Sequence, residues 1–438
     1  MSFPRYPEYK DSGVEWLGEV PGHWRVFTLK RLVSLKSGES ITAESIEENG
    51  TYPVYGGNGL RGYTESYTHE GLFALIGRQG ALCGNINYAN GRFWASEHAV
   101  VVSPRSAVIV GWVGELLRAM NLNQYSVSAA QPGLSVEIVG ALSIPVPPID
   151  EQSAIAAFLD RETAKIDALV AEQQNLIALL KEKRQALISH AVTKGLDPDV
   201  PMKDSGVAWL GQVPAHWVVL ALSRVTRERC DGPFGSGIKS DHYTDTGALV
   251  VRLQNIRSDG FHGGEPAFLD LEYFEQDLKR HEVVPGDVLI AGLGDENNVV
   301  GRACVAPDGI SPALVKADCF RFRLDGSVAA AAFVGAQLNV SAVADAGRLA
   351  NGSTRSRIPL SVMATRLIAL PPVAEQVGIV AFVERERAAI DELISEAETT
   401  TALLQERRTA LISAAVTGKI DVRHLAAAAT TDPTPEPA

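Results

Sequence analysis

The sequence has few of the residues that mark extracellular, membrane or metal-binding proteins. It contains only four cysteines in 438 residues, namely Cys83, Cys230, Cys304 and Cys319. None forms a CxxC pair, so the pattern favours reduced core cysteines over a zinc site or a disulfide framework. No apolar run approaches the roughly 18 residues that a membrane-spanning helix needs, and the N-terminus has no apolar signal core. We therefore expect a cytoplasmic protein.

An excess of basic charge is also absent. The chain has 40 lysines and arginines against 52 aspartates and glutamates, which gives a formal net charge of −12. This balance argues against a surface coated in basic side chains. It does not exclude nucleic-acid binding, because the local field at a groove matters more than the total charge.

Catalytic motifs are missing as well. The stretch Gly232–Ser240 resembles a phosphate loop, but Ile238 stands where that motif needs its lysine. Asp277 and Lys279 have the spacing of half a nuclease motif, without an acidic partner after a preceding strand, and we interpret them as part of a surface helix. His23 and His216 lie beside tryptophans in a repeated block, where we expect them to pack or to cap a turn. We predict no catalytic residues and no metal site on this chain.

What the sequence does contain is an internal repeat. Residues Pro147–Lys194 return as Pro371–Gly418, and 26 of the 48 aligned positions are identical without gaps. A shorter block, Lys10–Trp24, returns as Lys203–Trp217 with 12 of 15 positions identical. The order is block, insert and helix, twice over. The two inserts share no comparable identity, so the frame has been kept while the segments that it holds have diverged.

Both inserts, at about 25–145 and 218–370, are expected to be rich in strands. Short apolar runs ending in glycine or polar turns predict buried strands at 71–77, 98–102, 142–146, 248–253 and 288–291. One helix is predicted in each insert, at 109–122 and at 329–340. The similar texture of two unlike sequences indicates two readers of different targets.

The repeated segments show heptad spacing. In the first, interrupted by Gln173 and Lys183, the predicted seam is Ile166, Leu169, Leu176, Leu180 and Leu187. In the second, interrupted by Thr400 and Arg407, the predicted seam is Ile390, Leu393, Ala397, Leu404 and Leu411. Each helix alone is a poor core, so we predict that the two pack as an antiparallel pair.

Polar and basic residues are concentrated at the turns of both inserts. Arginine reads guanine edges, and asparagine and glutamine read adenine, while other lysines and arginines contact phosphates. For any single residue the alternative is a loop that is polar because it faces water. The DNA-binding candidates are Asn58, Arg61, Arg78, Gln79, Arg92, Lys239, Arg252, Gln254, Asn255, Arg257, Arg302, Arg355 and Arg357.

Several short motifs together resemble one known family. They are WLGEVPGHW at 16–24 and PPIDEQ at 147–152, each with its second copy, and the shorter stretches at 52–59, 77–80, 286–289 and 301–302. In this order, the chain resembles the specificity subunits of type I restriction-modification systems.

The resemblance implies an α+β fold with a pseudo-two-fold internal repeat. Two mixed α/β target-recognition domains would be joined by a long antiparallel two-helix coiled coil. The expected domains are 1–146 (first recognition domain), 147–197 (first conserved helix), 198–370 (second recognition domain), 371–424 (second conserved helix) and 425–438 (disordered tail).

The resemblance also implies a function. Each recognition domain would read one half of an asymmetric bipartite site on double-stranded DNA, while the helices set the spacer and dock two methyltransferase subunits. Two restriction subunits, which translocate DNA, would complete the endonuclease. The chain itself would be non-catalytic within this adenine DNA methyltransferase and endonuclease complex. It would hold no cofactor, with S-adenosylmethionine on the methyltransferase and ATP and Mg on the restriction subunit.

Two alternatives remain open at this point. One is a coiled-coil scaffold for protein interactions without sequence-specific DNA binding. The other is a fused enzyme, with a nuclease or methyltransferase hidden in one insert.

Overall fold

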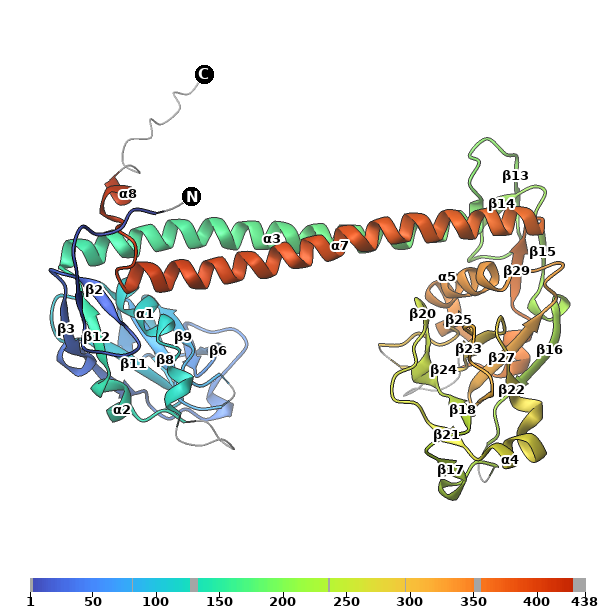
Figure 1. Cartoon of the computed structure of the whole chain (residues 1–438), viewed down its shortest axis with the longest axis horizontal. Coiled ribbons are helices and arrows are strands. Elements are labelled where there is room, and N and C mark those ends of the chain that lie inside the picture. The colour runs from blue at the N-terminus through green and yellow to red at the C-terminus, as the bar shows by residue number, and fades with distance from the viewer. Residues whose placement is uncertain are drawn as a thin grey trace. The chain divides into compact units, whose positions relative to one another are not determined.

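The computed structural model describes residues 3–80, 82–126, 133–234, 237–295, 297–349 and 356–427. The chain divides into two compact units of mixed α and β structure (Figure 1). Unit 1 comprises Met1–Asn175 together with Ala397–Ala438, and unit 2 comprises Leu176–Glu396. Each long helix is therefore shared, with one half in each unit.

The centre of unit 1 is an antiparallel sheet of four strands in the order β4-β11-β8-β9. Its strands are β4 (Val33–Ser37), β11 (Ala99–Pro104), β8 (Phe73–Gly77) and β9 (Ile86–Ala89). A second sheet contains β6 (Gly59–Thr64), β5 (Tyr52–Gly56), β10 (Arg92–Ala95) and β7 (His69–Glu70). Two smaller pairs are β1 (Tyr9–Asp11) with β2 (Glu19–Pro21), and β3 (Arg25–Thr28) with β12 (Ser143–Val146).

The centre of unit 2 is an antiparallel sheet in the order β16-β27-β23-β25. Its strands are β16 (Thr226–Asp231), β27 (Cys319–Leu324), β23 (Val288–Ala291) and β25 (Ala303–Val305). The second sheet has the order β17 (Tyr243–Thr244), β21 (Phe268–Leu269), β18 (Ala248–Val251), β26 (Ala313–Val315) and β22 (Glu282–Val283). The paired short strands are β13 (Met202–Asp204) with β14 (Gln212–Pro214), β15 (Val218–Ala221) with β29 (Leu367–Leu370), β19 (Ile256–Arg257) with β20 (Gly260–Phe261), and β24 (Leu293–Gly294) with β28 (Ser356–Arg357).

The central sheets of the two units match strand for strand, although the inserts share no comparable sequence identity. In unit 1, Ile76 pairs with Val100 on one side and Ile86 on the other. In unit 2, Ile290 pairs in the same way with Phe320 and Ala303. Buried strands need apolar side chains of suitable volume rather than particular residues. The same sheet is therefore built from unlike sequences.

The predicted insert helices and long helices are confirmed, but α5 extends nine residues beyond its predicted end at 340. Unit 1 contains α1 (Val110–Ala119), α2 (Val136–Ala141) and α8 (Arg423–Ala427). Unit 2 contains α4 (Leu271–Tyr273), α5 (Ala331–Leu349) and α6 (Leu360–Ala364). The long helices are α3 (Ile149–Lys194) and α7 (Val373–Val416).

The prediction that disorder begins near residue 425 is wrong for the first residues of the tail. Residues up to Ala427 are helical, and Leu425 packs against the core of unit 1. The carbonyl of Leu425 also accepts a hydrogen bond from Arg161 Nη1 at 3.3 Å. The remainder of the predicted tail, from residue 428, lies outside the described residues.

Each unit has its own apolar core, and each core contains the tryptophan that ends the repeated block. Trp24 and Trp217 are both completely buried. The core of unit 1 combines Trp24 with residues of α1, α3 and the second half of α7, and the core of unit 2 combines Trp217 with residues of α5 and the first half of α7. Among the described residues, no helix is long and apolar enough to cross a membrane.

Candidate nucleic-acid interface

In unit 1, the repeated block is fastened to the start of α3 by one carboxylate. Glu151 Oε2 accepts a hydrogen bond from Trp24 Nε1 at 2.9 Å and another from the Tyr6 hydroxyl at 3.2 Å. Glu151 Oε1 lies 2.7 Å from His23 Nε2. This geometry explains why the glutamate, histidine and tryptophan of the two motifs occur together, and it gives His23 a structural role.

Unit 2 repeats this clamp with its own copies of the motifs. Glu375 Oε1 accepts from Trp217 Nε1 at 3.0 Å, and Glu375 Oε2 lies 2.8 Å from His216 Nε2. The glutamate side chain is more exposed here, 34% against 10% for Glu151. The same three residue types therefore join block to helix in both units.

The glutamine that follows each glutamate accepts a hydrogen bond at the N-terminus of the insert helix. Gln152 Oε1 accepts from the amide of Ile109, the residue before α1, at 3.1 Å. Gln376 Oε1 accepts from the amide of Ala330, the residue before α5, at 2.7 Å. The first amides of a helix lack partners within the helix, so each side chain caps the insert helix and fixes it to the long helix. The repeated pair of motifs thus orients each insert on the frame.

The long helices pack along a seam in both units. In unit 1, Ile166 on α3 and Leu411 on α7 belong to one core cluster. In unit 2, Leu180 on α3 clusters with Ile390 and Ile394 on α7. In each unit one end of α3 meets the opposite end of α7, so the halves run antiparallel.

The predicted seam was wrong at three positions. Leu169, Leu176 and Leu393 are 45%, 44% and 50% exposed. The side chains that are buried or partly buried lie one residue further along, at Val170, Ile177 and Ile394. With this shift the α3 seam is 166, 170, 173, 177, 180, 184, 187 and 191, and the α7 seam is 390, 394, 397, 401, 404, 408, 411 and 415.

Steps of four and three residues alternate along both corrected seams, as a heptad requires. The same shift moves three of the predicted polar interruptions. Arg184, Thr401 and Arg408 are partly buried on the seam, whereas Lys183, Thr400 and Arg407 are exposed beside it. The error arose because leucine occurs on both sides of the seam, and the sequence pattern alone does not distinguish the two faces.

The two seam arginines form equivalent ion pairs. In unit 1, Arg408 Nε lies 2.9 Å from Asp167 Oδ1. In unit 2, Arg184 pairs with Asp391. Asp391 is the repeat copy of Asp167 and Arg408 is the copy of Arg184, both 224 residues apart in the sequence. Each unit therefore makes the same cross-helix contact with the roles of the two helices exchanged.

In unit 1, the five predicted DNA-binding residues lie on turns and strand ends of the insert. Asn58, Arg61 and Gln79 are exposed. Arg78 is partly buried, and its Nη1 donates to the Ser37 hydroxyl at 3.1 Å. Arg92 is exposed and lies over the Tyr67 ring, 5.0 Å from its centroid. Hydrogen bonds to Glu70 and Tyr52 raise the pKa of Arg92 above its ordinary value, so it stays charged.

The Asn58 turn and the Arg78–Gln79 turn are close together. A Cβ on Gly57 would lie 3.4 Å from the Gln79 carbonyl oxygen, and the Arg78 amide donates to the His98 carbonyl at 2.9 Å. The structure thus brings Asn58 and Gln79 to neighbouring positions at one end of the sheet. Arg61 lies on β6, the strand that pairs directly with β5.

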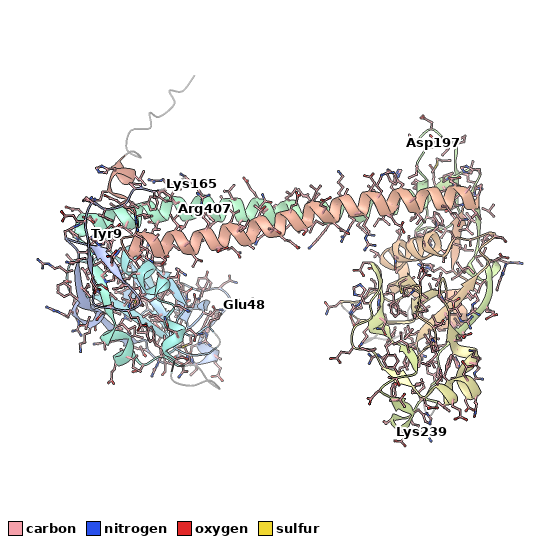
Figure 2. The ribbon with its side chains drawn as sticks, in the orientation of Figure 1. Tyr9, Glu48, Lys165, Asp197, Lys239 and Arg407 are labelled. Atoms are coloured by element: carbon pink, nitrogen blue, oxygen red, sulfur yellow. The ribbon has the colours of Figure 1, made fainter. Side chains whose placement is uncertain are left out.

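In unit 2, four of the predicted residues have exposed or partly exposed side chains. Lys239 and Gln254 are exposed, and Figure 2 labels Lys239 at the edge of the unit near β17. Arg357 is 50% exposed, with its Nε 2.7 Å from Asp318 Oδ1 and its guanidinium over the Phe234 ring. Arg257 is partly buried and bonds to Asn298. Arg355 lies outside the described residues.

Asn255 and Arg302 are structural residues, so their prediction as DNA contacts was wrong. Asn255 is 3% exposed, and its amide donates to the carbonyls of His262 and Gly263 at 2.7 and 3.0 Å. Arg302 is 5% exposed and donates to the carbonyls of four residues, Ile256, Leu293, Val299 and Leu253. Burial lowers the pKa of Arg302. Arg252 is intermediate, with its guanidinium bonded to the Glu265 carbonyl.

The described residues contain no cluster of three or more histidine, cysteine or acidic side chains arranged to hold a metal ion. The exposed groups of the turns are hydrogen-bond donors and acceptors of the kind that contact base edges and phosphates. The sequence analysis did not identify Tyr67 and Phe234 as the aromatic partners of Arg92 and Arg357. Each is an exposed ring beside an arginine in the fold, although each pair is far apart in the sequence.

The comparisons with known proteins agree with this arrangement. Residues 21–178 match the model of the type I restriction modification DNA specificity domain. The chain is 44% identical over 166 residues to the type I restriction enzyme EcoprrI specificity subunit of Escherichia coli, which covers 37% of this chain and 41% of that protein.

In its first half, the chain resembles the specificity subunits of type I restriction-modification systems.

A more distant member matches over a longer stretch. The EcoKI specificity subunit of Escherichia coli strain K12 is 21% identical over 336 residues, which is 73% of this chain and 68% of that protein. The matched regions of EcoprrI and of a putative Haemophilus influenzae specificity subunit cover only 41% and 32% of their lengths. The chain thus spans about two fifths or less of the length of these two curated relatives.

Solved structures of the family share the fold. A structure of the type I restriction-modification system aligns with a TM-score of 0.63 at 17% identity, covering 91% of this chain and 98% of that chain. The HsdS subunit from Thermoanaerobacter tengcongensis aligns with a TM-score of 0.51 at 16% identity and the same coverage. The signal that identified the family from the sequence was the paired repetition of the two motifs that the clamps join.

Proposed function

We propose that this chain is the DNA sequence-specificity subunit of a type I restriction-modification complex. The insert of each unit reads one half of an asymmetric bipartite site on double-stranded DNA. The observation that carries the proposal is the same frame, fastened in the same way by Glu151 and Glu375, presenting two inserts with different exposed side chains. Readers of two identical half-sites would have no reason to diverge.

The long helices, in this proposal, form one antiparallel coiled coil that joins the two recognition domains and sets the spacer. Support comes from the matching seam and the matching Asp–Arg pair in each unit. The coil also docks two methyltransferase subunits, and two restriction subunits join the assembly. The complex acts in the cytoplasm, where the DNA is.

The chain itself carries no catalytic group in this proposal. S-adenosylmethionine belongs to the methyltransferase partner, and ATP and Mg belong to the restriction partner. The supporting features are the structural roles of the residues that resembled catalytic ones. His23 and His216 hold the clamps, and Lys279 pairs with Glu275 and Glu282 at the surface.

The test replaces one reading segment and maps methylation. The segment Ala248–Arg257, which contains β18 and the turn after it, is exchanged for the equivalent segment of another specificity subunit. In a host that carries the methyltransferase partner, we expect one half of the methylated sequence to change and the other half to stay. A simultaneous change of both halves would contradict modular reading.

The protein-interaction scaffold makes the opposite prediction. Such a chain, assembled with the methyltransferase, would bind duplexes without sequence preference, and genomic methylation would show no bipartite motif. Methylation or cleavage by the purified chain alone would instead indicate a fused enzyme. The same methylation map therefore separates our proposal from the scaffold.

A further inference from the structure

The insert helices α1 and α5 occupy equivalent positions, which allows the two units to be compared residue by residue. The amides of Ile109 and Ala330 bond to the equivalent glutamines of the long helices. Five residues further on, each helix has a glycine that faces the last strand of the central sheet, Gly114 in unit 1 and Gly335 in unit 2. The environments of these two glycines differ.

In unit 1, a partly buried polar network fills the space next to this glycine. A Cβ on Gly114 would lie 2.2 Å from the hydroxyl oxygen of Tyr88, so the tyrosine packs directly on the helix backbone. The Tyr88 hydroxyl lies 3.2 Å from the Gly111 carbonyl and 3.0 Å from Glu115 Oε1. Arg118 Nε then bonds to Glu115 Oε2 at 3.0 Å. Burial raises the pKa of Tyr88, so the phenol is neutral.

In unit 2, smaller side chains stand at each equivalent position. Val305 replaces Tyr88, because both lie two residues beyond the corresponding pairs Ile76–Ile86 and Ile290–Ala303. Counting along the helices, Ala336 replaces Glu115 and Asn339 replaces Arg118. The atom nearest to a Cβ on Gly335 is a methyl of Val305, 3.9 Å away. In unit 2 the smaller Val305 packs near Gly335, which is buried, while Ala336 is partly buried and Ala332 is exposed.

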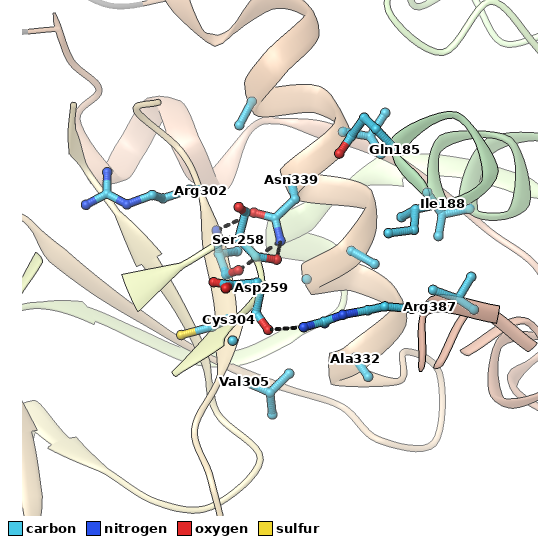
Figure 3. A pocket seen from close by; sticks show the side chains of 18 of the residues that line it. Gln185, Ile188, Ser258, Asp259, Arg302, Cys304, Val305, Ala332, Asn339 and Arg387 are labelled. Carbon is cyan, nitrogen blue, oxygen red and sulfur yellow. Dashed lines mark hydrogen bonds between the residues drawn. The ribbon is translucent and has the colours of Figure 1, made fainter. Parts of the chain in front are cut away.

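Val305, Ala336 and Asn339 line part of a cavity of about 380 Å³ within unit 2 (Figure 3). Its apolar walls are valine, alanine and isoleucine side chains of β25, α3, α5 and α7, with Gly335 among the lining residues. Charged and polar side chains also line it, among them Arg184, Gln185 and Glu384. Its rim is held by two polar contacts. Arg387 Nη2 donates to the Asp259 carbonyl at 3.0 Å, and Asn339 Nδ2 donates to the Ser258 carbonyl at 3.1 Å.

We propose that this cavity is a binding site for a para-hydroxyphenyl group. In unit 1 the fold itself places such a ring, that of Tyr88, against the same helix surface. In unit 2 the ring of a ligand lies in the cavity beside Val305 and Gly335, and its hydroxyl donates to the carbonyl of Ala332, the counterpart of Gly111. Apolar walls with a few polar groups at the rim are typical of sites for small aromatic ligands. The proposal does not depend on DNA recognition.

The probe is p-cresol, added to the full-length chain and followed by ligand-observed NMR and thermal unfolding. We expect saturable binding with a dissociation constant on the order of 1 mM, as befits a ligand of so few atoms. The Val305→Tyr variant places a ring in the cavity and should weaken binding at least tenfold. Val377→Tyr is the matched control, because Val377 is 56% exposed on α7 and does not line the cavity.

A second variant, Ala336→Leu, fills the cavity from the helix side, and thermal unfolding verifies that each variant is folded. Loss of binding in both cavity variants, with retention in Val377→Tyr, supports the site. Absence of saturable binding by the native chain at about 10 mM p-cresol would overturn it. Equal binding by the folded cavity variants and the native chain would overturn it too.

The group has two sources, and further arms of the experiment distinguish them. A phenol that co-purifies with the native chain in native mass spectrometry, and is lost in Val305→Tyr, identifies a free small molecule. A partner protein whose binding p-cresol inhibits, and which binds Val305→Tyr more weakly than Val377→Tyr, identifies a tyrosine side chain. Each result supports the site and names its occupant.

Discussion

The two clamp glutamates differ in burial, and this difference predicts unequal effects of their removal. Glu151→Ala leaves the buried indole N–H of Trp24 and the Tyr6 hydroxyl without their acceptor, which costs about 1–3 kcal/mol. Glu375→Ala should cost less, because the Glu375 side chain is 34% exposed and water can replace it. Urea unfolding followed by tryptophan fluorescence measures both. Equal losses would show that burial does not set the strength of the clamp.

The carboxyl group of Asp231 should make the stability of unit 2 depend on pH. Burial raises the pKa of its carboxyl to about 6, against an ordinary value of about 3.9. The folded state therefore binds this proton more tightly than the unfolded state does. The protonated carboxyl contributes fully to the stability of the folded state below about pH 4, and this stabilisation is lost as the pH rises through about 6. Asp231→Asn retains an oxygen for the amides of Gly232 and Asp318. Relative to the native chain, the variant should gain stability between pH 5 and pH 7.

The measurement is hydrogen exchange of the β27 amides, with native and variant chains compared at the same pH. Phe320 to Leu324 pair with β16, the strand that ends at Asp231, so their protection reports the affected region. A difference in protection that is the same at pH 5 and at pH 7 would contradict the assigned cause.

Arg302 and Arg357 should separate stability from DNA affinity. Arg302→Ala removes donors from the carbonyls of four residues in a buried site and should lower the thermal stability of unit 2. Arg357→Ala, at an exposed site, should leave stability nearly unchanged and weaken DNA binding by the complex with the methyltransferase. The salt dependence of binding should fall by about one ion if Arg357 contacts phosphate. Unchanged affinity at all salt concentrations would remove Arg357 from the interface.

These two arginines also show what residue patterns do not reveal. Both occur in polar turns, and both were predicted to contact DNA. Arg302 is buried among four backbone carbonyls, and those of Leu253 and Ile256 come from more than 40 residues away in the sequence, so no local pattern encodes the arrangement. Asn255 is buried by contacts nearer in the sequence, with the carbonyls of His262 and Gly263. The exposure of Asn58, Arg61 and Gln79 was within reach of the sequence, because their turns are short and rich in glycine.

At the scale of the elements, the existence of the long helices was evident from the sequence and the face that they bury was not. Leucines at 169, 176 and 393 lie beside the seam, so a count of apolar residues favoured the wrong face by one position. The partners across the seam decide the register, and they are more than 200 residues away. The Asp167–Arg408 and Arg184–Asp391 pairs carry this information, but it becomes visible only when the helices are placed side by side.

Adjacent residues of α3 test the corrected register. Ile177 packs against the cluster of Leu180, Ile390 and Ile394, whereas Leu176 is 44% exposed. Ile177→Asn should destabilise the packing of the helices by about 1–3 kcal/mol, because it removes a partly buried apolar side chain from the seam and introduces a polar one. Leu176→Asn, the matched control, should change stability by about 0.5 kcal/mol or less. Urea unfolding followed by circular dichroism measures both, and a larger effect at Leu176 would restore the earlier seam.

For the whole molecule, the proposed function predicts that the spacer follows the length of the helices. Insertion of one heptad after Asn175 and of another after Thr399, its repeat copy, preserves the seam on both sides of each insertion. Seven residues lengthen a helix by about 10 Å, which corresponds to about three base pairs of DNA. We expect the methylated motif to keep both half-sites and to gain about three base pairs between them.

The control for this experiment inserts three residues at the same two sites. Three residues do not complete a heptad, so the seam beyond the insertion turns away from its partner. This variant should lose methylation or assembly instead of acquiring a spacer longer by about one base pair. If the heptad variant methylates the original site with its original spacer, then the helices do not measure the distance between the half-sites. Another part of the complex would then have to set the distance between the two half-sites.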